Sequence, residues 1–179
     1  MKKLIALTLA LCALFSLAAC GKDEPAAPDG YKIASNEEIC SYTLYVPETW
    51  AAQSDRTDYT IAAVSSSDKC TVSVAKIEDD ALYDVTTVAE YWEKCKEKFT
   101  FLSDFAVTEE GAQISVGKDG TQGWRYTFSG KYNGADYKYM QVFFLKGRDF
   151  YCYTYTATAE HFDKHLSLVN DILSYFRFR

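Results

Sequence analysis

Positive charge is scarce in this chain of 179 residues, which has 19 lysines and arginines, 25 aspartates and glutamates, and a formal net charge of −6. The lysines and arginines are spread along the sequence and form no basic patch. Proteins that hold nucleic acid neutralise its phosphates with such side chains, and polybasic segments attach proteins to anionic membrane surfaces. We therefore expect no nucleic-acid partner and no domain lying flat on a charged membrane.

Histidine is rarer still, because His161 and His165 are the two histidines of the chain. Four residues apart on a helix, they would face the same way and could hold Zn²⁺ if a carboxylate joined them. The H-E-x-x-H pattern is absent, however, and Lys164 is adjacent to His165. Solvated histidines on a helix surface are the alternative that we favour. We therefore predict no metal site, and nothing in the sequence indicates a cofactor.

Motifs of catalysis and of phosphate binding are also missing. Serines are plentiful, but none lies in G-x-S-x-G, the turn that presents the nucleophile of many hydrolases. Gly117, Gly120 and Gly123 surround a charged turn with no helical pattern after it, so they predict a hairpin and not a phosphate loop. No catalytic residues are predicted.

Long apolar runs are limited to the start of the chain, where Met1-Lys2-Lys3 precedes sixteen residues, 4–19, that are almost all apolar. A helix needs about 20 such residues to cross a bilayer, so the run fits a signal peptide better than a membrane span. It ends in Leu17-Ala18-Ala19-Cys20, which matches the bacterial lipobox. We expect cleavage before Cys20 and a lipid anchor on its thiol. The alternatives are an ordinary signal peptide with a chance cysteine, or an apolar helix of the fold.

Residues 20–30 comprise Cys20 and a segment, 21–30, whose only apolar side chains are those of alanine and proline. Such a segment cannot bury enough surface to offset its conformational entropy, so it predicts a flexible tether. Aromatic and β-branched residues begin at Tyr31, and residues 31–179 have the length of one domain. The predicted location is the outer side of a cell membrane, with the lipid as the membrane contact.

Periodicity predicts strands and two helices in residues 31–179. The strands are predicted at 40–46, 59–64, 70–77, 112–116, 121–129, 137–146 and 150–157, with a turn at Ser65-Ser66-Ser67-Asp68 and a hairpin at Asn133-Gly134. One helix opens at the capping box Thr87-Val88-Ala89-Glu90, and its apolar face is Val88, Trp92, Cys95, Phe99 and Leu102. The other opens near Thr158, with Phe162, Leu166, Val169, Leu173 and Phe176 as its apolar face.

This order predicts an α+β fold. Strands joined by tight turns are antiparallel, and 137–145 and 150–155 carry large apolar residues on both faces. We therefore expect an antiparallel sheet of about six to seven strands with helices packed on both faces, an α/β/α sandwich.

The chain also resembles a known family. Val46-Pro47-Glu48-Thr49-Trp50, Gly123-Trp124-Arg125-Tyr126 and the closing Tyr153-x-Tyr155-x-Ala157 pattern are similar to the PsbP-like superfamily, and the likeness covers 31–179. That superfamily includes PsbP, Ran-binding Mog-type proteins and many bacterial lipoproteins. The resemblance implies an antiparallel sheet between helices and a non-catalytic binding or assembly role. It carries no functional residue over to this chain.

Tyrosine is abundant, with 14 residues. Tyr151, Tyr153 and Tyr155 alternate along one strand, where packing under a helix is the favoured interpretation. Three others, Tyr132, Tyr137 and Tyr139, flank the Asn133-Gly134 hairpin. Partly wet rings at such a loop suit a partner surface, because tyrosine combines an apolar body with a polar tip. The alternative is that these rings also fold under a helix.

Four cysteines remain after Cys20 and the discarded Cys12, namely Cys40, Cys70, Cys95 and Cys152. An even number in an exported domain predicts disulfides. If the first three strands form a meander, Cys40 and Cys70 meet at one edge. Cys95 and Cys152 could pair between helix and sheet, or both could be buried thiols.

Two functions remain open. The favoured one is a binding or assembly module that recruits an envelope protein, peptide or glycan. The alternative is an unrecognised envelope hydrolase or metal-dependent enzyme, assembled from residues that are distant in the sequence.

Overall fold

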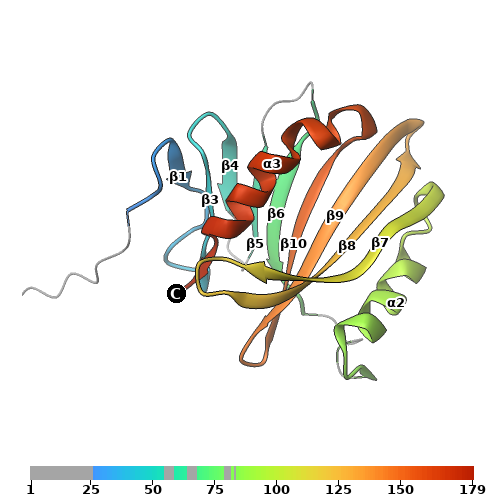
Figure 1. Ribbon diagram of the computed structural model, residues 1–179, viewed down its shortest axis with the longest axis horizontal. Coiled ribbons are helices and arrows are strands. Elements are labelled where there is room, and N and C mark those ends of the chain that lie inside the picture. The colour runs from blue at the N-terminus through green and yellow to red at the C-terminus, as the bar shows by residue number, and fades with distance from the viewer. Residues whose placement is uncertain (1–25, 55–58, 64–67, 79–81, 83) are drawn as a thin grey trace, which may run out of the picture.

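A seven-stranded antiparallel sheet forms the centre of the domain (Figure 1). The computed structural model describes residues 26–54, 59–63, 68–78, 82 and 84–179, so the signal-peptide segment, Cys20 and residues 65–67 of the predicted turn lie outside the described residues. In sheet order the strands are β4 (Ala51–Ser54), β5 (Tyr59–Ala63), β6 (Thr71–Lys76), β10 (Asp149–Thr158), β9 (Ala135–Lys146), β8 (Thr121–Tyr132) and β7 (Ser103–Val116). All neighbours in this sheet pair antiparallel, as predicted.

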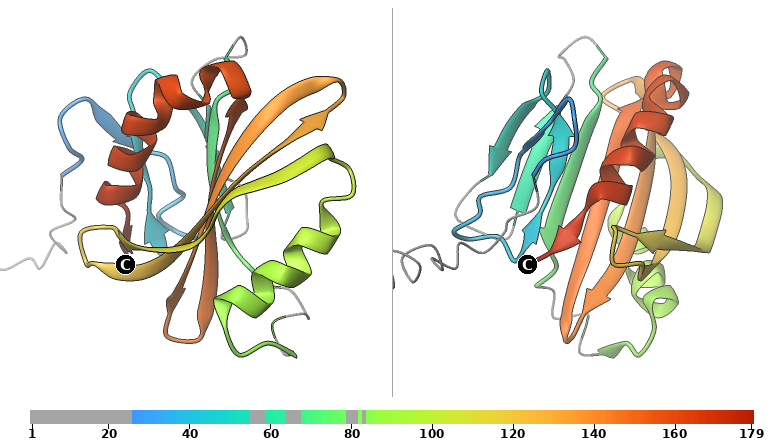
Figure 2. Two further views of the ribbon diagram at one scale, coloured as in Figure 1. Left: turned by 45° about the vertical axis from the view of Figure 1, so that its right-hand side comes forward. Right: turned by 60° about the vertical axis from the view of Figure 1, so that its left-hand side comes forward.

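Two helices cover opposite faces of the sheet (Figure 2), which confirms the predicted sandwich. The side chains of β10 alternate between them, because successive residues of a strand point to opposite faces. Tyr151, Tyr153 and Tyr155 pack with α3 (Ala159–Tyr175), whereas Phe150 and Cys152 pack with α2 (Val88–Lys98). Within the described residues, neither helix is long and apolar enough to cross a membrane.

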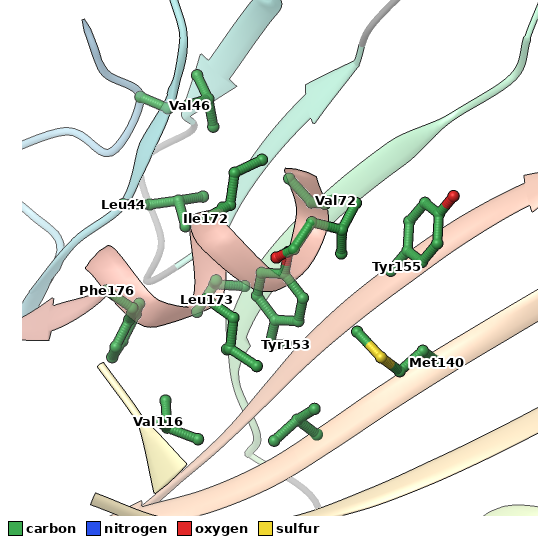
Figure 3. Packing of buried hydrophobic residues seen from close by; sticks show 14 of the residues in the cluster. Leu44, Val46, Val72, Val116, Met140, Tyr153, Tyr155, Ile172, Leu173 and Phe176 are labelled. Atoms are coloured by element: carbon green, nitrogen blue, oxygen red, sulfur yellow. The ribbon is translucent and has the colours of Figure 1, made fainter. Parts of the chain in front are cut away.

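Two short strand pairs share the α3 face of the sheet. β1 (Tyr31–Ile33) pairs with β3 (Tyr45–Pro47), and β2 (Tyr42–Thr43) pairs with β11 (Arg177–Phe178). Leu44 and Val46 are fully buried there and lie close to α3 (Figure 3).

The prediction that 40–46 forms the first strand of the main sheet is therefore wrong, because β4 takes the place beside β5. The side chains of this segment are buried on both of its faces, Tyr45 as well as Leu44 and Val46. In addition, the Tyr42 hydroxyl donates to the carbonyl of Val74 at 3.2 Å. The segment is thus held across the face of the sheet and not along its edge.

Local signals placed both helices correctly. The Thr87 hydroxyl accepts from the amide of Glu90 at 3.2 Å, and the Glu90 carboxylate accepts from the amide of Thr87 at 3.2 Å, which confirms the capping box. α2 ends at Lys98, so Phe99 and Leu102 follow the helix, although both still pack into the α2 cluster. The second helix has Thr158 as its N-cap, as predicted.

β7 is longer than predicted, since it begins at Ser103 and not at residue 112. Its pairing with β8 shifts register three times between Ser103 and Ala112. Each shift interrupts the two-residue alternation that marks a strand in a sequence. Gly111 lies in this part with a φ of 69°, a backbone conformation that glycine adopts without steric cost.

Candidate functional site

An exposed group of aromatic rings lies at the end of the β8–β9 hairpin, beside the segment that follows α2. Phe101 is 57% exposed and Tyr132 is 45% exposed, and their rings meet edge to face with centroids 6.0 Å apart. The ring centroids of Tyr132 and Tyr137 are 6.4 Å apart, and those of Tyr137 and Tyr139 are 6.2 Å apart. We call Phe101, Tyr132, Tyr137 and Tyr139 the aromatic surface.

The hairpin itself holds these rings in place. Asn133 and Gly134 have φ values of 50° and 79°, which is the geometry of the two-residue turn predicted from the sequence. Tyr137 and Tyr139 are two residues apart on β9 and therefore point to the same face of the sheet. The Tyr139 ring stacks on buried Phe128 with centroids 4.9 Å apart, and burial raises the pKa of the Tyr139 hydroxyl.

The structure thus brings together the three tyrosines that the sequence analysis proposed as a partner surface. It adds Phe101, which the sequence analysis missed. The signal available in the sequence was Phe99-x-Phe101, directly after the helical pattern. A short turn cannot bury two rings that are only one residue apart, so one of them had to be exposed. In the structure the Phe99 ring is stacked on Phe128, and its neighbour Phe101 is left in solvent.

The sheet beside Tyr139 carries hydroxyl groups. Opposite Tyr139 on β10 lies Thr156, and opposite Thr156 on β6 lies Thr71. Directly opposed residues of antiparallel strands point to the same face, so the hydroxyls adjoin the ring of Tyr139. Lys69 lies at the margin, with its ammonium group 5.9 Å from the centroid of Tyr137.

An apolar pocket of about 610 Å³ lies at the other end of α2. Its walls come from the start of the helix (Val88 and Tyr91), from β8 (Trp124 and Tyr126) and from Phe150 of β10. Among the described residues that line it, Arg148 is the one with a charged side chain. The pocket and the aromatic surface therefore lie on one face of the sheet, at opposite ends of the same helix.

Comparisons with known proteins identify the fold. No protein-family model and no curated protein sequence matches the chain. Solved structures do match, and they include the cyanobacterial PsbP protein CyanoP from Synechocystis sp. PCC 6803. The TM-score is 0.57, and the sequences are 12% identical over 92% of this chain and 99% of CyanoP. The Ran-binding protein Mog1p of Saccharomyces cerevisiae has a TM-score of 0.55 and 12% identity over 83% and 95% of the two chains. LpqN of Mycobacterium tuberculosis, which is described as involved in cell envelope biogenesis, has a TM-score of 0.50 and 16% identity over 82% and 88%. The fold is PsbP-like.

On the α3 side of this PsbP-like domain, both histidines approach one carboxylate. Asp68 accepts from His165 Nε2 and from Lys164 Nζ, each at 2.8 Å, and His161 Nε2 lies 3.8 Å away. The hydrogen bonds from Lys164 and His165 hold the pKa of the Asp68 carboxyl below its ordinary value. A carboxylate does therefore join the two histidines, but it is already bonded to an ammonium group.

The described residues contain no group of three or more His, Cys, Asp and Glu side chains able to hold a metal ion. Neither His161 nor His165 lines the apolar pocket next to α2. The arrangement links α3 to the turn before β6.

A smaller hollow of about 220 Å³ lies between α3 and the strands β7, β8 and β9. Its polar side chains satisfy one another, since Arg125 Nε and Nη2 donate to the two oxygens of Glu109 at 2.7 and 2.8 Å. The hydroxyl of Thr127 donates to the same carboxylate at 3.1 Å. These bonds lower the pKa of the Glu109 carboxyl, the contacts with Arg125 being the main cause.

The four cysteines form no disulfide in the part of the chain that the structure describes. The predicted meeting of Cys40 and Cys70 on adjacent strands is wrong, because Cys40 precedes β2, which pairs with β11 and not with a strand of the main sheet. Cys95 and Cys152 do share the cluster under α2, and burial raises the pKa of the Cys152 thiol to about 12.

The packing interpretation of Tyr151, Tyr153 and Tyr155 is confirmed, because all three are buried under α3. Their polar ends have partners. The Tyr153 hydroxyl donates to the carbonyl of Val169 at 3.1 Å, and that of Tyr155 donates to the carbonyl of Phe162 at 2.7 Å.

Proposed function

We propose that residues 31–179 form a non-catalytic binding module, anchored to the outer side of a cell membrane by lipid on Cys20, and that the aromatic surface contacts its partner. The observation that carries the proposal is the contact between Phe101 and Tyr132, two large rings that are exposed together. Isolated exposed apolar residues are common on proteins, whereas a contiguous group of rings is typical of an interaction site.

The nature of the surface supports a protein or peptide of the envelope as the partner, with an uncharged glycan as the alternative. Tyrosine and phenylalanine are enriched at protein interfaces because they bury a large area and lose little conformational entropy. The row of threonines beside Tyr139 adds hydroxyl groups that suit either kind of partner.

Similar folds are consistent with such a role. Among the structural neighbours are a Ran-binding protein and a protein involved in cell envelope biogenesis. The lipobox at residues 17–20 supports the location, and the segment 20–30 supplies reach between the lipid and the domain.

The test is affinity capture from envelope extracts with the full lipoprotein and with the double variant Tyr132→Ala/Tyr137→Ala. We expect the captured partner to be lost from this variant. The matched control is Ile33→Ala/Ile39→Ala, which removes two exposed apolar side chains far from the hairpin in the sequence and should keep the partner. Robust hydrolysis of a wall or ester substrate by the purified protein, abolished by His161→Ala, would instead establish the enzyme.

A further inference from the structure

We propose that the apolar pocket at the N-terminal end of α2 binds an anionic amphiphile, a molecule with an extended apolar chain and a carboxylate or phosphate group at one end. This inference is independent of the aromatic surface, which lies at the opposite end of the helix.

The walls of the pocket indicate the apolar part of the ligand. Tyr91 and Val88 from α2 face Trp124 and Tyr126 from β8, and Phe150 closes the space. Pockets of 300–1,000 Å³ lined mainly by such side chains are typical small-molecule sites, and about 610 Å³ lies within that range. A polar ligand body would lose its hydrogen bonds with water there and find few replacements.

One edge of the pocket is apolar surface that water still reaches. Leu145, near the end of β9, lines the pocket and is 43% exposed. A chain entering the pocket would cover this side chain, and the burial of apolar surface would favour binding.

Arg148 indicates the anionic end. It lies in the two-residue turn between β9 and β10, lines the pocket and is exposed. Within the described residues Arg148 forms no ion pair, and its neighbour Asp149 pairs with Lys76 at 2.9 Å. A guanidinium group can bind a carboxylate or a phosphate through two parallel hydrogen bonds.

The start of α2 is not available as the anion site. It already carries a carboxylate of the protein, because Glu90 accepts from the amides of Thr86 and Thr87 at 2.6 and 3.2 Å. A second anion at this position would be repelled by Glu90. The charged end of the ligand is therefore assigned to Arg148 and its apolar chain to the space between α2 and β8.

The experiment uses the mature chain, residues 20–179, with Cys20→Ser, so that neither the signal peptide nor an acyl group of its own can enter the pocket. Binding of the fluorescent fatty acid cis-parinarate is measured, with oleate, oleyl alcohol and oleoyl-lysophosphatidylglycerol as competitors. We expect saturable binding at one site, with oleate displacing the probe better than the uncharged alcohol. The relative strengths of oleate and the lysophospholipid distinguish a free fatty acid from a lipid headgroup as the source of the anion.

Two variants assign the two ends of the ligand. Leu145→Glu places a negative charge on the exposed edge of the pocket and should weaken probe binding at least about tenfold. Arg148→Ala should weaken oleate about tenfold and leave oleyl alcohol unchanged, because the alcohol forms no ion pair. Ile39→Glu is the matched control for the first change, since Ile39 is 39% exposed and does not line the pocket.

Binding that fails to saturate, or that Leu145→Glu leaves intact, would overturn the proposal. So would equal losses of oleate and oleyl alcohol in Arg148→Ala, which would remove the assigned role of the charge. Displacement of the probe by apolar acidic peptides and not by oleate would also overturn it, in favour of a protein segment as the occupant.

Discussion

Asp68 and His165 lie 97 residues apart in the sequence and share a hydrogen bond of 2.8 Å between Oδ2 and Nε2. The same carboxylate accepts from Lys164 at 2.8 Å, so a single side chain ties the middle of α3 to the turn that opens β6. Both bonds favour the ionised carboxylate and lower its pKa.

This contact makes stability depend on pH in a defined direction. A carboxyl group whose pKa is lower in the folded than in the unfolded state stabilises the fold fully above its unfolded pKa of about 3.9. That contribution is lost as the pH falls through the lower, folded pKa. Asp68→Asn should therefore unfold at lower urea concentration than wild type at about pH 7, and the difference should shrink as the pH falls below about 4. Asp171→Asn, an exposed position on α3, is the control. A difference that is constant down to about pH 2 would contradict the assignment.

The capping box of α2 predicts a second stability effect. Thr87→Ala removes the hydroxyl that accepts from the Glu90 amide and should lower the free energy of unfolding by about 1 kcal/mol. Thr87→Ser keeps the hydroxyl and should lie much closer to wild type. Chemical denaturation of the three proteins measures this, and equal losses in both variants would show that the methyl group and not the hydrogen bond matters.

The cysteines should differ in reactivity. In the reduced protein at about pH 8, roughly one Cys152 thiol in 10⁴ is ionised, because burial raises its pKa to about 12. Burial also raises the pKa of Cys70 to about 11. Iodoacetamide should therefore modify half-buried Cys95 first and reach Cys70 and Cys152 only after unfolding in urea. Mass spectrometry of timed samples gives the order, and early labelling of Cys152 would contradict it.

The bridge between Cys95 and Cys152 stays a prediction for the oxidised, exported protein. A non-reducing peptide map tests it, since the two residues share one cluster. A Cys40–Cys70 bridge in that map would contradict the strand order of the sheet.

The lipid anchor has its own test. Cys20→Ala should abolish incorporation of radioactive palmitate and leave the precursor uncleaved or release the protein from the membrane fraction. Cys12→Ala is the control, because Cys12 lies within the segment that cleavage removes, and it should be labelled like wild type. Absence of lipid from the wild-type protein would overturn the anchor and the location proposed with it.

Several features of this domain followed from a few adjacent residues. The capping box from Thr87 to Glu90, the Asn133-Gly134 turn and the alternation along β10 each depend on the backbone preferences and hydrogen bonds of neighbouring positions. Their outcome changes little with the rest of the chain, so the helix starts, the hairpin and the sandwich could be predicted. The three hairpin tyrosines followed for the same reason, since a tight turn with strand alternation places Tyr137 and Tyr139 on one face.

Other features depended on which distant segments compete for the same position. Segment 40–46 has the alternation of a sheet strand, yet both its faces are buried and the Tyr42 hydroxyl bonds to the carbonyl of Val74. The segment therefore lies across the sheet, and Cys40 with it. Phe101 is exposed because the ring of Phe99 stacks on Phe128 in its place. Asp68 reaches His165 only when α3 packs on β6. The pocket beside Arg148 likewise arises between α2 and the β9–β10 turn. The sequence alone was enough to predict the two helix starts, the Asn133-Gly134 hairpin and the two alternating faces of β10. Tertiary packing decided which strand occupies the edge and which side chains meet, because those choices depend on free-energy differences between whole arrangements of the chain.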